Sequence, residues 1–243
     1  MRVKMARTQR FSHRGGQTLP YRVQCRRRLI TYFGLVDSIM NFTLLLIAVT
    51  VVVSWNAFKN RKLADRCVLW PPAISRFKQY DRLLTHGFIH GDLAHLIFNM
   101  LTLFFFGQSV EQVMQRITGS AFTFLFFYLT AIVVAILPSY IKESKNPEYL
   151  SLGSSGAISA VLFAFILLQP WALIVVFFLP IPSIVYAALY IGYSVWMQRQ
   201  GESHINHSAH LSGAAFGLLF MLCMEPRLAS IFLYQLARPH FSF

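Results

Sequence analysis

Gly153-Ser154-Ser155-Gly156, followed by a short apolar run that ends before Pro170, is the stretch that decides the fold. Read as a helix over about residues 153–169, it has roughly 17 residues and a length of about 25 Å. The hydrocarbon core of a bilayer is about 30 Å thick, so a helix of this length begins or ends below the membrane surface. We therefore expect a hydroxyl group in its first turn to lie inside the membrane.

Ser155 is the candidate nucleophile in this first turn. The unpaired backbone N–H groups and the positive end of the helix dipole at a helix start favour a developing negative charge. Small residues at a helix start also serve as caps and packing contacts. The Gly-x-Ser-Gly pattern alone therefore leaves both interpretations open.

The composition is that of a membrane protein. Of the 243 residues, 56% are hydrophobic and only 13% are charged, whereas a soluble domain usually has about 25% charged residues. The repeated apolar runs indicate one membrane domain that crosses the bilayer several times, with little mass outside it. The three cysteines are widely spaced and fit neither a disulfide framework nor a metal-binding pattern.

The net charge of +13 is concentrated near the N-terminus, where many basic residues and no acid precede Asp37. An arm that binds nucleic acid would look similar. Beside a membrane span, however, the pattern favours a cytoplasmic tail, residues 1–35, that contacts anionic lipid. We therefore expect no nucleic-acid partner. An organellar transit peptide, which is also rich in Arg and free of acids, remains an alternative.

Six apolar segments predict an all-α bundle of six membrane-spanning helices. The membrane domain is expected over residues 36–225, with a short C-terminal tail at 226–243. Trp70-Pro71-Pro72 blocks a continuous helix in the long first connection, and two prolines interrupt the apolar run of residues 171–197. The expected spans are residues 39–55, 93–113, 121–137, 153–169, 183–197 and 209–224.

An even number of spans puts both termini on one side, and the basic N-terminus places that side in the cytoplasm. The second, fourth and sixth helices then all begin near the outer face. A basic excess in the first outer loop opposes this orientation, but the denser N-terminal tail is expected to dominate. The topology therefore predicts that polar groups at the three helix starts converge at one depth.

Polar residues on the second helix form one of these groups. His95 and Asn99 are four residues apart and share a helix face, and His90 lies near the helix entry. Both His95 and Asn99 can present hydrogen-bond donors to a point beside that face. Such residues either line a helix–helix contact or belong to a functional site, and both interpretations stay open here.

The sixth helix begins with His210 and carries Gly213 and Gly217, a stripe of small residues that lets another backbone approach closely. Gly156 and Ala160 give the fourth helix a similar stripe. If the two stripes pack together, His210 comes beside the serine hydroxyl, which is the minimal arrangement for nucleophilic catalysis. Burial should keep the imidazole neutral and able to accept a proton. Because no acid is shown to reach it, we expect a dyad.

Two other uses of the histidines are considered. A metal site would draw on His90, His95, His204, His207 and His210. The chain has no His-Glu-x-x-His helix and no supporting carboxylates nearby, so neither a metal nor another cofactor is expected. A small transporter or channel could instead use buried histidines as a proton relay.

The three motifs together resemble the rhomboid family of intramembrane serine proteases, over about residues 36–224. The motifs are His90-x4-His95-x3-Asn99, Gly153-x-Ser155-Gly156 and Ala209-His210-x2-Gly213-x3-Gly217. The pattern is similar to the six-helix bacterial form. By this resemblance, Ser155 is the nucleophile and His210 is the general base and later the acid.

The resemblance also implies the supporting roles. His95 and Asn99 are similar to the side-chain donors of the family's oxyanion hole, which the backbone N–H of Ser155 completes. His90 is expected to be structural. Arg82 and Glu111 match positions that support the first loop and the inner end of the second helix.

The chain departs from the family pattern at two positions. Asp81 precedes Arg82 where the family often has Trp, which affects how the first loop is seated in lipid. Ser159 stands four residues after the nucleophile, where many members have an aromatic ring that stacks on the catalytic imidazole. Some other group must then orient His210.

The resemblance implies an intramembrane serine endopeptidase that cuts transmembrane-helix substrates near the outer membrane boundary and needs no cofactor. Its location would be a bacterial inner membrane, with both termini cytoplasmic. The alternative is a rhomboid-like scaffold without protease activity that binds or moves membrane clients.

Overall fold

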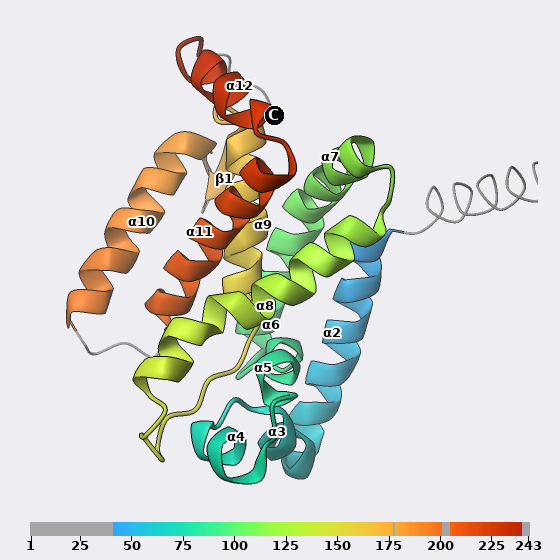
Figure 1. Cartoon of the computed structure of the whole chain (residues 1–243), viewed down its shortest axis with the longest axis vertical. Coiled ribbons are helices and arrows are strands. Elements are labelled where there is room, and N and C mark those ends of the chain that lie inside the picture. The colour runs from blue at the N-terminus through green and yellow to red at the C-terminus, as the bar shows by residue number, and fades with distance from the viewer. Residues whose placement is uncertain (1–40, 177, 201–204, 240–243) are drawn as a thin grey trace, which may run out of the picture.

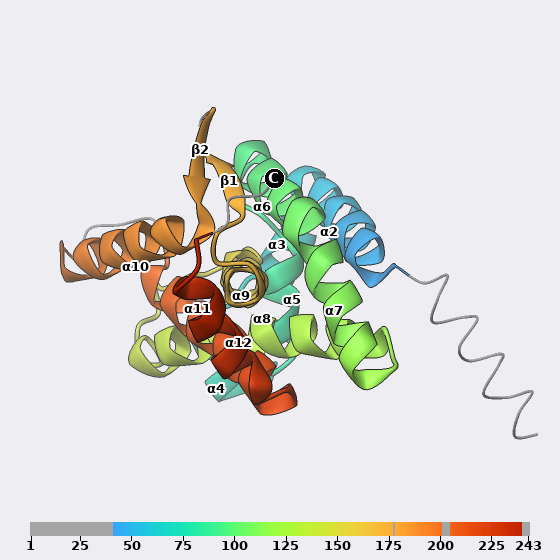
Figure 2. The ribbon, with the colours of Figure 1, turned by 90° about the horizontal axis from the view of Figure 1, so that it is seen from above.

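The computed structural model describes residues 41–176, 178–200 and 205–239. Within these residues the chain forms a helical bundle around α9 (Ser155–Leu168), which lies at its centre in Figure 2. Every residue of α9 from Gly156 to Leu167 is buried. A helix that is apolar on all sides belongs inside a bundle, and that is its position here. The tail at residues 1–35 and His204 lie outside the described residues.

The helices around α9 run alternately in opposite directions, so that α6, α9 and α11 all begin toward the same end of the bundle (Figure 1). The second predicted span is a continuous rod in which a π-helical turn, η2, joins α6 to α7. The helices that surround α9 are α2 (Phe42–Lys59), α6 (Leu93–Thr102) with η2 (Leu103–Gly107) and α7 (Gln108–Thr118), α8 (Phe122–Lys142), α10 (Ser183–Gln200) and α11 (His207–Met224).

Four helices in the described part of the chain are long and apolar enough to cross a membrane: α2, the α6–α7 rod, α8 and α11. The protein is therefore an integral membrane protein with a helical fold, as its composition predicts. The central α9 is apolar but has only 14 residues. The helix α10 has 18 residues and is not among the four. The count of six spans thus stays a prediction.

Short helices fill the first connection, where the sequence predicts a break. They are α3 (Arg61–Cys67), α4 (Pro71–Phe77), α5 (Arg82–Thr85) and η1 (His86–Phe88). Pro71 and Pro72 occupy the first positions of α4, where a missing N–H costs nothing. Backbone bonds between Leu69 and Ser151 tie this connection to the segment before α9.

Two features differ from the sequence-based expectation. Residues 171–182, expected to be a simple interfacial connection, form an antiparallel hairpin of β1 (Leu173–Val176) and β2 (Leu179–Pro182). Each strand has a free edge, so the prolines of β2 are tolerated. The expected short tail contains a further helix, α12 (Arg227–Leu236), which begins directly after Pro226. It is held to the bundle where the Trp171 indole donates to the Gln235 carbonyl.

Glu111 fixes the start of α2. Its buried carboxylate accepts hydrogen bonds from the backbone N–H groups of Phe42 and Thr43, at 2.7 and 2.9 Å, and from the Thr43 hydroxyl. A carboxylate here satisfies orphan N–H groups and lies at the positive end of the helix dipole. Glu111 thereby joins α7 to α2 at the end of the bundle opposite the starts of α6 and α11 (Figure 1).

The closest helix pair is α9 with α11. A methyl group built on Gly213 would lie 2.0 Å from the carbonyl oxygen of Gly156, and one built on Gly217 would lie 2.2 Å from that of Ala160. Both distances are far below van der Waals contact, so only glycine fits at these two positions. The two stripes of small residues that the sequence shows therefore pack against each other.

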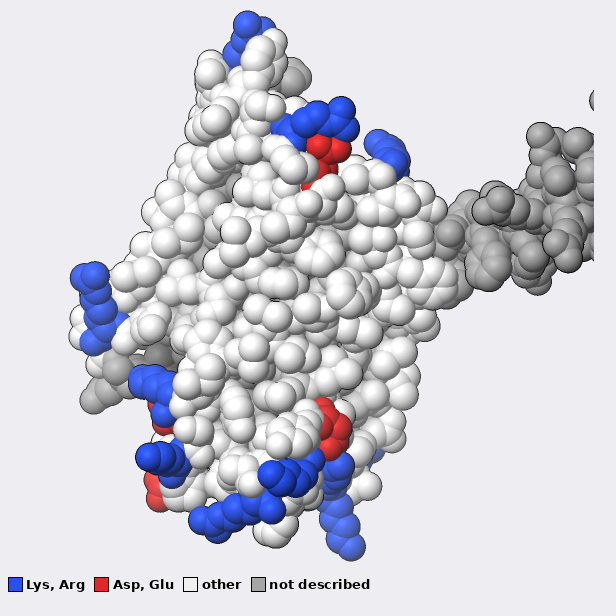
Figure 3. Space-filling view, viewed as in Figure 1, with Lys and Arg blue, Asp and Glu red and all other residues white. Residues whose placement is uncertain are grey.

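On the face that Figure 3 shows, most charged side chains lie toward the two ends of the molecule, and the band between them is largely uncharged. This distribution suits a chain that spans a bilayer, because a charge at the bilayer centre is costly.

The atoms nearest to a methyl group on Gly213 are backbone atoms of Gly156, which cannot move aside as a flexible side chain can. Gly213→Ala should therefore force α9 and α11 apart. We expect the free energy of unfolding to fall by about 1–3 kcal/mol, measured as a lower Tm of the detergent-solubilised protein. The matched control is Gly192→Ala on α10, where a methyl group meets nothing within 4 Å. That change should leave Tm the same or slightly higher. Equal effects of the two substitutions would contradict the packing described here.

Candidate active site

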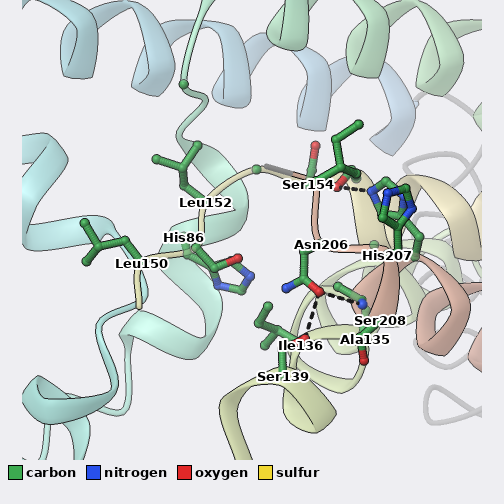
Figure 4. A pocket seen from close by; sticks show the side chains of 18 of the residues that line it. His86, Ala135, Ile136, Ser139, Leu150, Leu152, Ser154, Asn206, His207 and Ser208 are labelled. Atoms are coloured by element: carbon green, nitrogen blue, oxygen red, sulfur yellow. Dashed lines mark hydrogen bonds between the residues drawn. The ribbon is translucent and has the colours of Figure 1, made fainter. Parts of the chain in front are cut away.

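A cavity of about 1060 Å³ opens at the end of the bundle where α6, α9 and α11 begin. Leu150 and Leu152 line one side of it, and Ser154 and His207 line the other (Figure 4). Four of the five polar residues predicted to converge at these helix starts line this one cavity, and the fifth, His90, lies outside the lining and contacts Asn99. The four are His95, Asn99, Ser155 and His210.

Ser155 and His210 meet inside this cavity. The Ser155 Oγ lies 2.8 Å from the Nε2 of His210, a hydrogen-bond distance between residues 55 apart in the chain. Ser155 is the first residue of α9 and His210 lies in the first turn of α11. The close approach of α9 to α11 one turn further along, at Gly213, brings the two side chains together.

Asn206 fixes the start of α11, and the sequence analysis did not single it out. Its Oδ1 accepts the backbone N–H of Ala209 and the hydroxyl of Ser139, as Figure 4 shows, and its Nδ2 donates to the Tyr149 hydroxyl. Asn206 thus caps the helix that carries His210 and ties it to α8. An Asn three residues before the predicted span at 209–224 is an N-cap signal that identifies such a residue.

Gly153 lets the segment before α9 pass close to His95. Its φ is +104°, a conformation that favours glycine. A methyl group on Gly153 would also lie only 2.6 Å from the His95 ring. The Gly153 N–H donates to the backbone carbonyl of His86 at 2.9 Å. The sequence therefore needs glycine here on two independent grounds, and the His95 imidazole is seated directly against the backbone that leads into α9.

His90 links three segments through a buried hydrogen-bond chain. Its Nε2 lies 3.0 Å from the Nδ2 of Asn99, which can only donate, so the imidazole proton is on Nδ1. That Nδ1–H donates to the Ser54 hydroxyl, which in turn donates to the Phe88 carbonyl. Burial lowers the pKa of His90 to about 3. The ring is therefore neutral, as this series of hydrogen bonds requires. The hydrogen bond to His90 thereby fixes the side chain of Asn99.

A second set of contacts surrounds the His210 ring. The Tyr190 ring of α10 stacks on it, with centroids 6.0 Å apart and planes 25° from parallel. The Tyr190 hydroxyl lies 2.5 Å from the Ser159 Oγ, and the Ser159 hydroxyl donates to the Ser155 carbonyl at 2.9 Å. Tyr190 is not predictable from the sequence, because the spacing of the aromatic residues on α10 does not reveal which of them faces His210.

Arg82 holds the first connection together. It is buried, and its Nη1 donates to the backbone carbonyls of Asp65 and Val68 at 2.8 and 2.6 Å. The neighbouring Asp81 forms an exposed ion pair with Arg66 at 2.7 Å. The hydrogen bond from Arg66 lowers the pKa of the Asp81 carboxyl. Asp81 therefore has a local partner in this loop, and Arg82 braces the loop through backbone carbonyls.

Within the described residues, no group of three or more His, Cys, Asp or Glu side chains is placed to hold a metal ion. The chemistry that the cavity offers is that of a hydroxyl, an imidazole and several hydrogen-bond donors.

The chain is similar to a known family and to several known proteins. The family model of the Rhomboid domain matches residues 78–227. The mitochondrial RHOMBOID-like protein 12 of Arabidopsis thaliana is 30% identical over 198 residues, which are 75% of this chain and 57% of that protein. The mitochondrial presenilin-associated rhomboid-like protein of Bos taurus is 30% identical over 144 residues, 57% of this chain and 37% of that protein.

A bacterial relative matches over more of its own length. The protein named "Putative rhomboid protease YdcA" in Bacillus subtilis is 28% identical over 174 residues, which are 68% of this chain and 80% of that protein. By contrast, the chain spans only about a third to a little over half of the length of the two mitochondrial relatives.

The buried histidines of the first connection predict a loss of stability in acid. Burial lowers the pKa of His86 to about 4 and that of His90 to about 3, whereas both titrate near 6.5 in an unfolded chain. Between these values the unfolded state binds more protons than the folded state, so the free energy of unfolding falls as pH drops from about 6.5 to 4. We expect Tm in detergent to fall over that window and to change much less between pH 7 and 8.

The variant His86→Gln provides the comparison, because glutamine does not titrate. Its Tm should fall less steeply than that of the wild type over the same pH window. If the two slopes are equal, His86 does not contribute to the acid sensitivity.

Proposed function

The chain belongs to the rhomboid family, and from that premise we propose that it is an intramembrane serine endopeptidase. The family includes intramembrane serine proteases. The observation that carries the proposal for this chain is the 2.8 Å contact between the Ser155 Oγ and the His210 Nε2. A hydroxyl within hydrogen-bond reach of an imidazole is the arrangement that activates a serine nucleophile.

In the proposed reaction, the Ser155 Oγ attacks the carbonyl carbon of the scissile peptide bond while its proton moves to the Nε2 of His210. The resulting tetrahedral intermediate collapses, the C–N bond breaks, and the imidazolium gives its proton to the leaving amine. A water molecule then attacks the acyl ester, with His210 again taking and returning a proton. The cavity, lined by polar residues near the bundle end, supplies the route for that water.

The oxyanion of the intermediate is proposed to be bound by three donors: the Ser155 backbone N–H and the side chains of His95 and Asn99. The Ser155 N–H is at the start of α9, where backbone donors lack helical partners and the helix dipole favours negative charge. One Nδ2 hydrogen of Asn99 bonds to His90, which leaves the other for the substrate. Donors fixed before the reaction stabilise charge without reorganisation.

The proposed substrates are single transmembrane helices that unwind locally near the outer membrane boundary and have a small residue at the cut. Because the cavity lies at one end of the bundle and not at its middle, the cut would fall near one membrane surface. The basic segment at residues 1–35 is proposed to be cytoplasmic and to contact anionic lipid. The proposed location, a bacterial inner membrane, follows only from the resemblance to the six-helix bacterial form, whereas mitochondrial proteins stand among the relatives.

Labelling with a fluorophosphonate probe tests this function, because the probe reacts only with an activated serine. The detergent-solubilised wild type should be labelled, whereas Ser155→Ala and His210→Ala should lose labelling and cleavage of a single-span substrate. The matched control is Ser208→Ala, which removes another hydroxyl from the same cavity. Equal labelling of wild type and Ser155→Ala rejects Ser155 as nucleophile. A wild type that is neither labelled nor active supports the scaffold alternative.

Asn99→Ala separates oxyanion binding from nucleophile activation. Loss of one oxyanion donor commonly lowers the rate by about 10² to 10³. We expect turnover of the same substrate to fall by that order while probe labelling remains detectable. Thr102→Ala on the same helix, outside the cavity lining, is the control and should retain turnover. A neutral Asn99→Ala would remove this residue from the oxyanion hole.

A further inference from the structure

The imidazole of His210 needs an orienting group, and Ser159, one turn after Ser155 on α9, has no ring to supply it. We propose that Tyr190 of α10 is the positioning residue of His210, with its ring against the imidazole and its hydroxyl anchored by Ser159. This inference rests on the proposed function, because it assigns how the general base is held.

The stacking geometry is specific to Tyr190. Its ring centroid lies 6.0 Å from that of His210 with an interplanar angle of 25°, so the two rings stack with nearly parallel, offset planes. His207 meets the His210 ring edge to face, with centroids 5.9 Å apart and planes at 78°. The two neighbours together restrict rotation of the imidazole about its side-chain bonds, and Tyr190 is the one that defines the plane of the ring.

Hydrogen-bond accounting fixes the direction of the anchor. Ser159 has a single hydroxyl proton, which it donates to the Ser155 carbonyl at 2.9 Å. The Ser159 Oγ is therefore the acceptor in its 2.5 Å contact with the Tyr190 hydroxyl, and Tyr190 is the donor. Ser159 is thus linked to His210 indirectly, through the Tyr190 ring on α10.

These contacts close a circuit through three helices. Ser155 bonds to His210, His210 stacks on Tyr190, Tyr190 bonds to Ser159, and Ser159 bonds back to the carbonyl of Ser155. The circuit joins α9, α10 and α11, and α10 lies beside α11 in Figure 1. Phe163 also packs on the Tyr190 ring, with centroids 5.6 Å apart, and supports it from α9.

The face of the Tyr190 ring also has a chemical effect. When His210 takes the serine proton it becomes an imidazolium, and the face of an aromatic ring attracts a cation. This interaction is stronger in the transition state than in the resting enzyme, so its loss lowers kcat rather than raising KM. Loss of both the stack and the cation contact corresponds to a fall in kcat of about tenfold.

The test compares single and double variants in a cleavage assay with a single-span peptide substrate. Tyr190→Leu removes the ring and should lower kcat about tenfold with KM changed less than about twofold. Tyr190→Phe keeps the ring and should recover most of kcat. The control Trp196→Leu removes an exposed aromatic ring from the same helix. This ring contacts Tyr193, and the described residues show no ring contact between it and His210 or Tyr190, so the variant should retain kcat. A raised KM at constant kcat in Tyr190→Leu would assign the ring to the substrate and overturn the proposal.

The hydroxyl anchor is tested by a double-mutant cycle. Ser159→Ala and Tyr190→Phe each delete one partner of the same hydrogen bond, so the double variant should be no slower than the slower single variant. Additive losses would show that the two hydroxyls act separately, and would overturn the anchor.

A spectroscopic measurement does not depend on activity. The carbon-bound ring protons of His210, assigned by comparison with His210→Ala, should shift in the NMR spectrum of Tyr190→Leu, because the ring current of the stacked tyrosine is lost. They should shift little in Trp196→Leu, which removes a ring that contacts Tyr193. Unchanged His210 resonances in Tyr190→Leu overturn the stacking. If Tyr190→Leu shows this shift but the wild type is neither labelled at Ser155 nor active, the proposed function is rejected while the stacking stands.

Discussion

The backbone contact between α9 and α11 is the constraint on which the rest of the structure depends. In lipid there is little hydrophobic gain in bringing two apolar helices together, so they associate through close packing and hydrogen bonds. Gly213 and Gly217 provide that packing, because any side chain there would collide with carbonyl oxygens of α9. The contact sets the distance between the helix axes, and that distance allows the Ser155 and His210 side chains to meet.

Several polar groups of the site are stable in an apolar bundle because they belong to hydrogen-bond chains. His90 is a neutral link between Asn99 and Ser54, and Asn206 satisfies groups on α8 and α11 at once. A buried polar group without a partner costs free energy, so the same bonds that remove this cost also fix the side chains. The fold and the proposed chemistry therefore use one set of interactions.

Much of this arrangement could be predicted from the sequence, because it follows from topology and from short local patterns. Alternating helices put the starts carrying His95, Ser155 and His210 at one end, and the glycine spacing predicted which helices touch. The hairpin at residues 173–182 was missed because an apolar run with two prolines has no periodicity that distinguishes a strand from a loop. Helix α12 is not predictable in the same way, because it has only 10 residues and directly follows Pro226.

Tyr190 could not be found by the same reasoning, and the cause is physical. The helix α10 carries tyrosines at positions 186, 190 and 193, and which ring meets His210 depends on how that helix is rotated in the bundle. Rotation is set by tertiary contacts such as the bond to Ser159, which joins residues 31 apart. A ring is also a suitable orienting group at this depth, since burying a carboxylate in the membrane is costly. An aromatic neighbour stabilises an imidazolium without a permanent charge, which is consistent with the proposed dyad and with the proposed positioning of its base by packing.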